Sequence, residues 1–262
     1  MTKKYKVLDQ KITMSRRAFV QAAAAGSIVV LGEGCTTVSQ AFTPTEAQMA
    51  QLAASAWTDL KAQQPTTNDP KYVSRVRRVM PKIIRAAGDN PAGWEVQVFA
   101  SKDLNAFALP GGKIGFYTGI LDIMENDSQI ATVMGHEVAH VKFNHAGQRY
   151  GRTAATQAGL GVAQVVLGGG SQMSQAALGA LGLGAQYGVI LPFSRQHELE
   201  ADKYGLRYMN IAGYDLNEAI RFWEKMSSMK SGAPPEILST HPSDATRIAQ
   251  LRREIALLRG GA

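Results

Sequence analysis

Residues 135–140 read Gly-His-Glu-Val-Ala-His, an HExxH pattern inside a segment whose apolar spacing predicts a helix. Residues four apart on an α-helix differ by about 40° around its axis, so His136 and His140 present their rings to one side. Two imidazoles on one side can bind one metal ion, with Glu137 beside it. The alternative is an ordinary amphipathic helix with two half-exposed histidines, and a third ligand decides between the two.

The chemistry that fits this spacing is hydrolysis assisted by zinc. Neutral imidazole nitrogens suit Zn²⁺, and catalytic zinc sites use three protein ligands so that the fourth position holds water. Zinc lowers the pKa of that water to about 7, and a neighbouring carboxylate takes its proton as the oxygen attacks a carbonyl carbon. The pattern therefore predicts Glu137 as the general base.

The third ligand does not follow the metzincin spacing. That spacing requires glycine at position 143 and histidine at position 146, where the chain has Phe143 and Ala146. His145 is no substitute, because on a continuing helix it would point about 180° away from His136. We therefore expect His145 to be a surface histidine.

A better candidate for the third ligand is Glu198. On a helix it shares a face with Asp202, so Glu198 could bind the metal while Asp202 orients a ligand histidine. Glu200 would point about 200° away from Glu198, and His197 would lie about 100° away as a bystander or a neighbour of the ligands. The alternative for this segment is the solvated start of a charged helix.

Three segments together resemble the HtpX and CAAX-prenyl-protease family of zinc endopeptidases. They are His-Glu-Val-Ala-His at 136–140, Ser-Arg-x-x-Glu-x-x-Ala-Asp at 194–202 and Asn-Ala-Phe-Ala-Leu-Pro-Gly-Gly at 105–112. Within the family, the chain is most similar to the compact periplasmic lipoprotein branch, and matching motifs run from about Asn105 to Arg247. The resemblance implies an α+β fold, a predominantly α-helical zincin of the gluzincin type with a small sheet.

The resemblance also implies roles for individual residues. His136, His140 and Glu198 would bind one Zn²⁺ per chain, and Glu137 would be the general base, with Arg195 and Asp202 supporting the site. A catalytic role is implied for His241, which would either stabilise the oxyanion or occupy the open coordination position in a latent form. From the residues alone, His241 is a loop histidine ahead of a final helix.

Apolar spacing predicts the elements that position these residues. We expect helices over 45–64, 72–87, 128–148, 216–229 and from beyond His241 to about 258. Strands are expected over 94–99 and 113–118. The outer strand would run from Asn105 to Leu109, so that Asn105, Ala106, Phe107 and Ala108 border the active-site cleft and pair with an extended substrate. The alternative is a plain structural hairpin.

The N-terminal residues 1–34 resemble an export signal of the twin-arginine and lipoprotein type. Lysines precede Ser-Arg-Arg-Ala-Phe-Val at 15–20, and an apolar run follows. Cys35 is the only cysteine, so it is the predicted lipidation site, residues 35–44 the tether and residues 45–262 the catalytic domain. Acidic Glu33 departs from the usual lipoprotein pattern, and an uncleaved anchor is the alternative.

Charge and composition complete the sequence-based expectations. The net charge is +7, but residues 1–34 hold six basic and two acidic residues, which leaves about +3 for the rest, so nucleic-acid binding is not indicated. Residues 153–193 carry no charge and nine glycines, and predict either a mobile lid or a packed helical hairpin.

We therefore expect a zinc endopeptidase of the periplasm. It would be lipid-anchored, with the outer membrane favoured because Thr36 follows Cys35. Its substrates would be unfolded or misassembled envelope proteins, and its role envelope quality control. The alternatives are a latent assembly factor or chaperone that keeps the metallopeptidase fold, and a scaffold without metal.

Overall fold

The computed structural model describes residues 43–159, 193–229, 235–241 and 245–260. The predicted export signal, Cys35 and most of the glycine-rich segment 153–193 lie outside these ranges. Among the helices that the structure describes, none is both long and apolar enough to cross a membrane.

A three-stranded mixed sheet lies at the centre of the described chain. Its strands are β1 (Glu95–Phe99), β2 (Ala106–Leu109) and β3 (Lys113–Tyr117), in the spatial order β1-β3-β2. β3 pairs with β1 in parallel and with β2 in antiparallel register. Gly111 and Gly112 both have positive φ in the turn between β2 and β3, a conformation that costs glycine little. β2 is thus an edge strand, as predicted for this segment.

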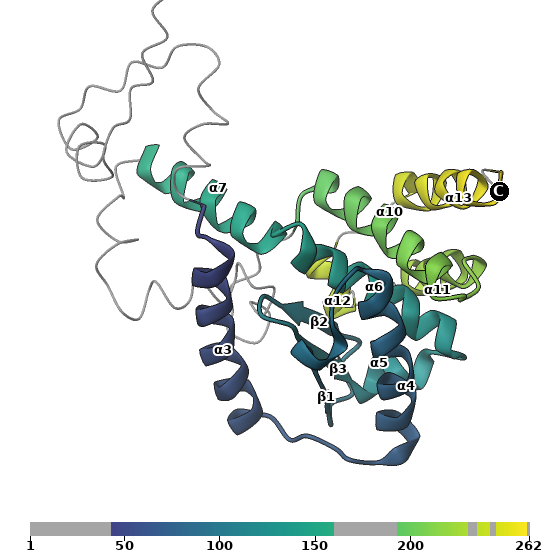
Figure 1. Ribbon diagram of the computed structural model, residues 1–262, viewed down its shortest axis with the longest axis horizontal. Helices are drawn as coiled ribbons and strands as arrows, with labels where there is room; N and C mark the ends of the chain where they lie inside the picture. The colour runs from purple at the N-terminus through teal and green to yellow at the C-terminus, as the bar shows by residue number, and fades with distance from the viewer. Residues whose placement is uncertain (1–42, 160–192, 230–234, 242–244, 261–262) are drawn as a thin grey trace, which may run out of the picture. The chain divides into compact units, whose positions relative to one another are not determined.

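The two faces of the sheet pack against different helices. α3 (Glu46–Gln63) covers one face, where Trp57 meets the rings of Phe99 and Phe107 at centroid distances of 5.8 and 6.2 Å. The other face packs against α4 (Pro70–Ala86) and α6 (Asp127–Lys142) within the larger apolar core. Figure 1 shows the strands between α3 on one side and α4 and α6 on the other.

Local signals explain where these helices begin. The hydroxyl of Thr45 accepts the Gln48 N–H in a capping box at the start of α3, and Asp69 caps α4, whose first residue is Pro70. The amide oxygen of Asn126 accepts the Gln129 N–H at the start of α6. The short helix α5 (Thr118–Ile123) lies between β3 and α6.

The predicted helix over 128–148 is two helices. α6 ends at Lys142, Asn144 takes a left-handed conformation with φ of 50°, and α7 (His145–Gly159) follows in a new direction. Asparagine is among the residues that best tolerate this conformation. This turn changes the direction of every side chain that follows it.

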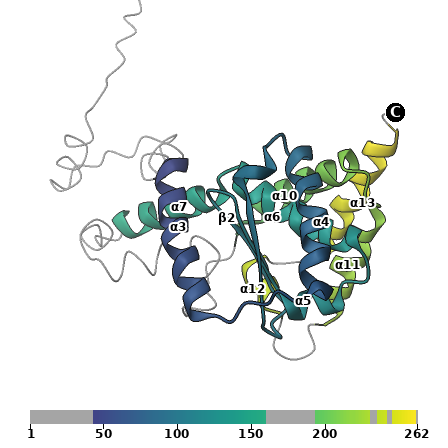
Figure 2. The same ribbon diagram turned by 60° about the horizontal axis from the view of Figure 1, so that its bottom comes forward.

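The remaining helices pack around α6. They are α10 (Arg195–Ile211), α11 (Asn217–Ser228), α12 (Glu236–Thr240) and α13 (Ala245–Gly260). Phe222 and Trp223 of α11 are buried, as predicted. In Figure 2, α10 and α6 lie side by side, in agreement with their extensive packing in the core. The predicted fold class, α+β with predominantly helical structure and a small sheet, is confirmed.

Candidate metal centre

α6 presents the HExxH residues toward the interior. His136, Glu137 and His140 are 1, 2 and 3 % exposed, so none of the three is a surface residue. Every residue from Gln129 to His140 is buried. The polar side chains are tolerated there because they contact one another or other polar groups. An ordinary amphipathic helix with half-exposed histidines is therefore excluded.

α10 crosses α6 at two glycines, Gly135 of α6 and Gly205 of α10. A Cβ added to Gly135 would lie 3.0 Å from the carbonyl oxygen of Gly205, and one added to Gly205 would lie 2.9 Å from the backbone nitrogen of His136. This close crossing brings the first turns of α10 against the HExxH segment. Ser194 caps α10 by accepting the His197 N–H, and Glu198 lies one turn into the helix.

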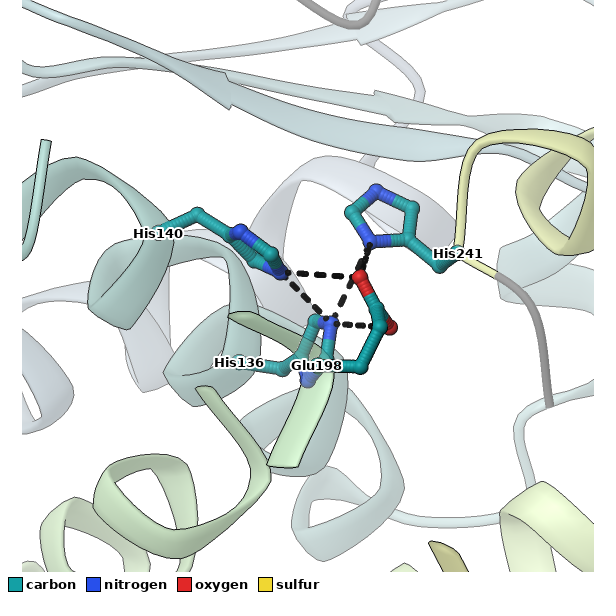
Figure 3. Close-up of side chains that lie close together, drawn as sticks. All are labelled: His136, His140, Glu198 and His241. Atoms are coloured by element: carbon teal, nitrogen blue, oxygen red, sulfur yellow. Dashed lines mark hydrogen bonds and ion pairs between the residues drawn. The ribbon is translucent and has the colours of Figure 1, made fainter. Parts of the chain in front are cut away.

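Four buried side chains converge at this crossing: His136, His140, Glu198 and His241. One ligand atom from each lies within 4.8 Å of all the others. Nε2 of His136 is 3.0 Å from Nε2 of His140 and 3.3 Å from Nδ1 of His241. Oε1 of Glu198 is 3.4 Å from the His140 nitrogen and 3.1 Å from the His241 nitrogen. Figure 3 shows the carboxylate between the rings.

This donor set fits zinc. Ligand atoms at about 2.05 Å from a tetrahedral zinc ion lie about 3.3 Å from one another. Five contacts between the ring nitrogens and the Glu198 oxygens of this set have lengths from 3.0 to 3.5 Å. Three imidazoles and one carboxylate are ligands that zinc accepts. Facing ring nitrogens in a buried cluster need a proton or a cation between them, which a metal ion supplies.

Asp202 and Arg247 contact members of this cluster. Oδ1 of Asp202 lies 2.9 Å from Nδ1 of His136, and the guanidinium of Arg247 donates to both oxygens of Asp202 at 2.7 Å. Arg247 Nη1 also lies 2.8 Å from Oε2 of Glu198. The chain thus places one buried guanidinium between two buried carboxylates, and each carboxylate faces a histidine of the cluster.

The pKa shifts within the cluster differ in direction: burial holds the pKa of His140 well below its ordinary value, whereas charged neighbours determine the shifts of His136 and Glu198. Burial by itself lowers the pKa of His136, but its contacts with Asp202 and Glu198 raise it to about 9. Burial would raise the pKa of Glu198, yet His241 and Arg247 hold it well below its ordinary value. The carboxylate is therefore ionised and available to a cation.

Glu137 stands beside the cluster rather than within it. Its Oε2 accepts the backbone N–H of Ala108 in β2 at 3.3 Å, and its Oε1 lies 3.4 Å from Nε2 of His241. Oε1 is buried and has no hydrogen-bond partner within the described part of the chain. A buried acceptor without a donor is where a water molecule can bind.

Phe193 covers one side of the cluster. Its ring centroid lies 4.0 Å from that of His140 and 5.0 Å from that of His241, and the guanidinium of Arg149 lies 3.7 Å above its ring. The Phe193 N–H donates to the carbonyl of Thr240 at 3.0 Å, which joins the start of α10 to the His241 segment. Sequence reasoning did not single out Phe193 or Arg149.

The structure corrects one expectation from the sequence. His145 is not a surface histidine, because the turn at Asn144 directs it inward, where it is fully buried with Nδ1 at 3.0 Å from Nδ1 of His140. Arg195 is exposed at the first turn of α10, and its predicted supporting role stays a prediction. Arg247 is an arginine in contact with both carboxylates. A signal for Arg247 exists in the sequence, since it shares a helical face with Leu251 and Ile255.

The remaining residues considered in the sequence analysis lie outside the four-residue cluster. His197 is buried and stacks on His145 at a centroid distance of 4.2 Å, outside the four-residue cluster. Glu200 lies on another side of α10 from Glu198, with its side chain 43 % exposed. In the predicted outer strand, Ala106 to Leu109 form β2, and buried Asn105 precedes it, with its carbonyl accepting the Tyr117 N–H.

Fold and site together have the arrangement of a gluzincin-type metallopeptidase site. His136, Glu137 and His140 lie on one helix, and Glu198 comes from a second helix beside it. Comparison with known families agrees, because the model of peptidase family M48 matches residues 70–255. The chain belongs to this family.

Individual relatives extend over a similar part of the chain. The mitochondrial metalloendopeptidase OMA1 of Schizosaccharomyces pombe is 35 % identical over 194 residues, which cover 73 % of this chain and 54 % of the relative. OMA1 of Arabidopsis thaliana is 34 % identical, with coverages of 77 and 40 %. The beta-barrel assembly-enhancing protease of Escherichia coli is 29 % identical, with coverages of 76 and 42 %. The chain thus spans about half the length of these relatives.

Proposed function

We propose that this chain hydrolyses peptide bonds in unfolded or misassembled proteins of the cell envelope, as a step of envelope protein quality control. The observation that supports it most directly is the buried cluster of His136, His140 and Glu198, with Glu137 beside it and not in it. The name of the Escherichia coli relative, a beta-barrel assembly-enhancing protease, supports the envelope as the setting.

In this proposal, His136, His140 and Glu198 hold zinc and Glu137 moves the proton. Bound zinc supplies a Lewis acid that polarises the scissile carbonyl and makes water acidic enough to lose a proton near neutral pH. Glu137 would take one proton from the attacking water as the C–O bond forms, and would then give it to the leaving amine nitrogen, whose C–N bond breaks. The Ala108 N–H, which donates to Glu137, orients the carboxylate.

His241 has a different role in the same proposal. Its Nδ1 lies 3.3 Å from the His136 nitrogen and 3.1 Å from the Glu198 oxygen, so it completes a set of four donors in this conformation. A centre with four protein ligands has no open position for water. We therefore assign the described arrangement to a latent form, in which His241 has to withdraw before a substrate can bind.

The free edge of β2 is the proposed contact surface for an extended substrate. The register with β3 leaves the backbone groups of Ala106 and Ala108 directed away from the sheet, and the Ala108 N–H reaches Glu137. A peptide paired with this edge would present its main chain to the general base. The segment from Asn105 to Ala108 would then align the scissile bond.

The proposed location follows from the N-terminal residues. The signal-like residues 1–34 and Cys35 support export and a lipid anchor, as in the compact periplasmic lipoprotein branch of the HtpX and CAAX-prenyl-protease relatives, and Thr36 favours the outer membrane. Membrane fractionation of the wild type and a Cys35→Ala variant tests this. A lipid anchor predicts loss of the variant from the membrane fraction, and equal membrane association contradicts it.

Zinc content and casein cleavage, measured on the same preparations, test the hydrolytic function. The wild type is expected to hold one zinc ion per chain and to cleave casein, and Glu137→Gln is expected to keep the zinc and lose at least about a hundredfold in rate. A preparation without zinc would favour a scaffold that needs no metal. Equal cleavage by Glu137→Gln would exclude Glu137 as the base.

A second candidate function is a latent assembly factor that keeps zinc without hydrolysis. The observation that favours it is His241, which closes the donor set. The two functions predict different results for variants tested in cells that depend on the protein. A hydrolase requires both Glu137 and His140, whereas an assembly factor with structural zinc tolerates Glu137→Gln and fails with His140→Ala.

A further inference from the structure

The two histidines of the HExxH segment have different neighbours at their second ring nitrogen. Nδ1 of His136 faces the carboxylate of Asp202 directly at 2.9 Å. Nδ1 of His140 faces no carboxylate among the described residues, but lies 3.0 Å from Nδ1 of a further histidine, His145. The other nitrogen of His145, Nε2, lies 3.0 Å from Oε2 of Glu200. Glu200 and Asp202 both belong to α10.

The positions of the protons in this chain of contacts follow from the chemistry of the groups. A carboxylate oxygen only accepts, so the His145 Nε2 that faces Glu200 carries a proton. His145 is fully buried, which favours the neutral ring with a single proton. Its Nδ1 is therefore an acceptor, and the proton between the two rings belongs to Nδ1 of His140.

That assignment determines which nitrogen of His140 is free. With Nδ1 protonated, the lone pair of a neutral ring is on Nε2, the atom that lies 3.0 Å from Nε2 of His136 and 3.4 Å from Oε1 of Glu198. This is the tautomer that a metal ligand at this position requires. The opposite tautomer would direct an N–H into the donor cluster.

We propose that His145 is a positioning residue, which with Glu200 holds His140 in the tautomer and orientation that bind zinc. The inference rests on the proposed function, since it takes His140 as a ligand. It means that both ligand histidines are oriented from α10, His136 by Asp202 directly and His140 by Glu200 through an intervening imidazole.

The surroundings of His145 suit this task. The left-handed turn at Asn144 directs the ring back toward His140. His197 stacks on one face of the His145 ring at a centroid distance of 4.2 Å and an interplanar angle of 9°, which fixes the plane of the ring. Arg152 in turn lies 3.1 Å from His197. A ring held on both its nitrogens and on one face has little freedom to rotate.

Zinc affinity, measured by competition with a chromophoric chelator on the full chain, tests the proposal. His145→Leu keeps the size of the side chain and removes both contacts, and its affinity is expected to fall by about 10- to 100-fold. His145→Asn places an acceptor oxygen near the Nδ1 position and is expected to recover most of the loss. Equal affinities of the wild type and His145→Leu would overturn the proposal, as would equal losses in His145→Leu and His145→Asn.

A second pair of variants keeps the test valid if His145→Leu does not fold. Glu200→Ala removes the acceptor at the outer end of the chain of contacts, and Glu224→Ala removes a glutamate of similar exposure, 47 % against 43 %, whose partner is Arg252. Glu200→Ala is expected to weaken zinc binding several-fold and Glu224→Ala to leave it unchanged. Equal affinities in the two variants would contradict the proposal.

Nitrogen-detected NMR of the histidine rings gives a readout that a packing role would not change. In the zinc-loaded wild type, His140 is expected to show a protonated Nδ1 and His145 a protonated Nε2, and the His140 proton signal is expected to exchange faster with water in Glu200→Ala. The reverse tautomers would overturn the proposal. A wild type that binds no zinc would instead refute the proposed function.

Discussion

At the scale of single residues, Arg247 determines whether the centre can exist in a buried position. Glu198 and Asp202 are both nearly inaccessible, and the Arg247 guanidinium lies within 2.8 Å of each carboxylate while stacking over Trp223 at 4.5 Å. Removing one member of a buried ionic network leaves uncompensated charge in a medium of low dielectric constant.

Replacement of Arg247 by leucine is therefore expected to lower the free energy of unfolding by about 3–5 kcal/mol. The matched control is Arg252→Leu, since Arg252 pairs with Glu224 at the surface and such pairs contribute at most about 1 kcal/mol. Chemical denaturation of both variants, loaded with zinc, measures the difference. Equal losses would show that the buried network contributes no more than a surface ion pair.

Residue chemistry was also the part of the site that could be predicted best. The spacing of His136, Glu137 and His140 follows from helix geometry, and the position of Asp202 four residues after Glu198 indicated its contact with a ligand histidine. His145 was mispredicted because its direction depends on a turn at Asn144, which local spacing does not reveal. Arg247 was missed because its partners lie 45 or more residues away in the chain.

At the scale of elements, the crossing of α6 and α10 sets the separation of the ligands. Gly135 and Gly205 allow the two backbones to approach at the turn that carries His136. A methyl group on Gly205 would meet the backbone nitrogen of His136 at 2.9 Å, and a backbone atom can move only with its helix.

Gly205→Ala is accordingly expected to push α10 away from α6, to cost about 1–3 kcal/mol in stability and to weaken zinc binding. Gly93→Ala is the control, because nothing lies within 4 Å of a Cβ built there and its φ is not positive. Thermal unfolding and chelator competition on the two variants measure both effects. If Gly205→Ala retains wild-type zinc affinity, the crossing does not control the ligand separation.

The contact between α3 and the sheet depends on pH through Glu95. Lys61 of α3 and Lys113 of β3 each contact this carboxylate, at 2.9 and 3.0 Å. Partial burial alone would raise the pKa of Glu95, but the hydrogen bonds from Lys61 and Lys113 lower it from 4.5 to about 2. A lowered folded-state pKa adds stability that is complete above pH 4.5 and is lost as the pH falls through about 2.

The stability difference between the wild type and Glu95→Gln is thus expected to be constant near neutral pH and to vanish between pH 4.5 and about 2. Urea titrations at a series of pH values measure it. Because the side chain is 39 % exposed, salt should reduce the difference. A difference that does not change with pH would contradict this role for Glu95.

At the scale of the whole molecule, the centre joins three distant segments of the chain. Its donors come from α6, from α10 and from the residue that follows α12, and His241 lies 105 residues after His136 in the chain. Elements near either end of the described chain, such as α3 and α13, contribute no donor to it. A ligand that binds only the folded state stabilises it in proportion to the logarithm of its concentration over its dissociation constant.

Removal of zinc is therefore expected to lower the thermal unfolding midpoint of the entire domain. The corresponding loss in the free energy of unfolding is about 4 kcal/mol when free zinc is a thousand times its dissociation constant. Circular dichroism before and after chelation measures the shift, and added zinc should restore it. His140→Ala, which lacks a donor, should show a smaller response. Identical midpoints with and without chelator would mean that the fold does not depend on the ion.

The side chains of β2 have a consequence for which proteins could serve as substrates in the proposed function. On the face toward α6, the strand carries only the methyl groups of Ala106 and Ala108, while Phe107 and Leu109 point to the α3 side. An edge with such small groups offers a visiting polypeptide mainly backbone partners, and these are the same for every amino acid except proline, which lacks the N–H. Selection on this edge would then depend on whether a client exposes a stretch of extended chain, so conformation rather than sequence would mark a protein for cleavage.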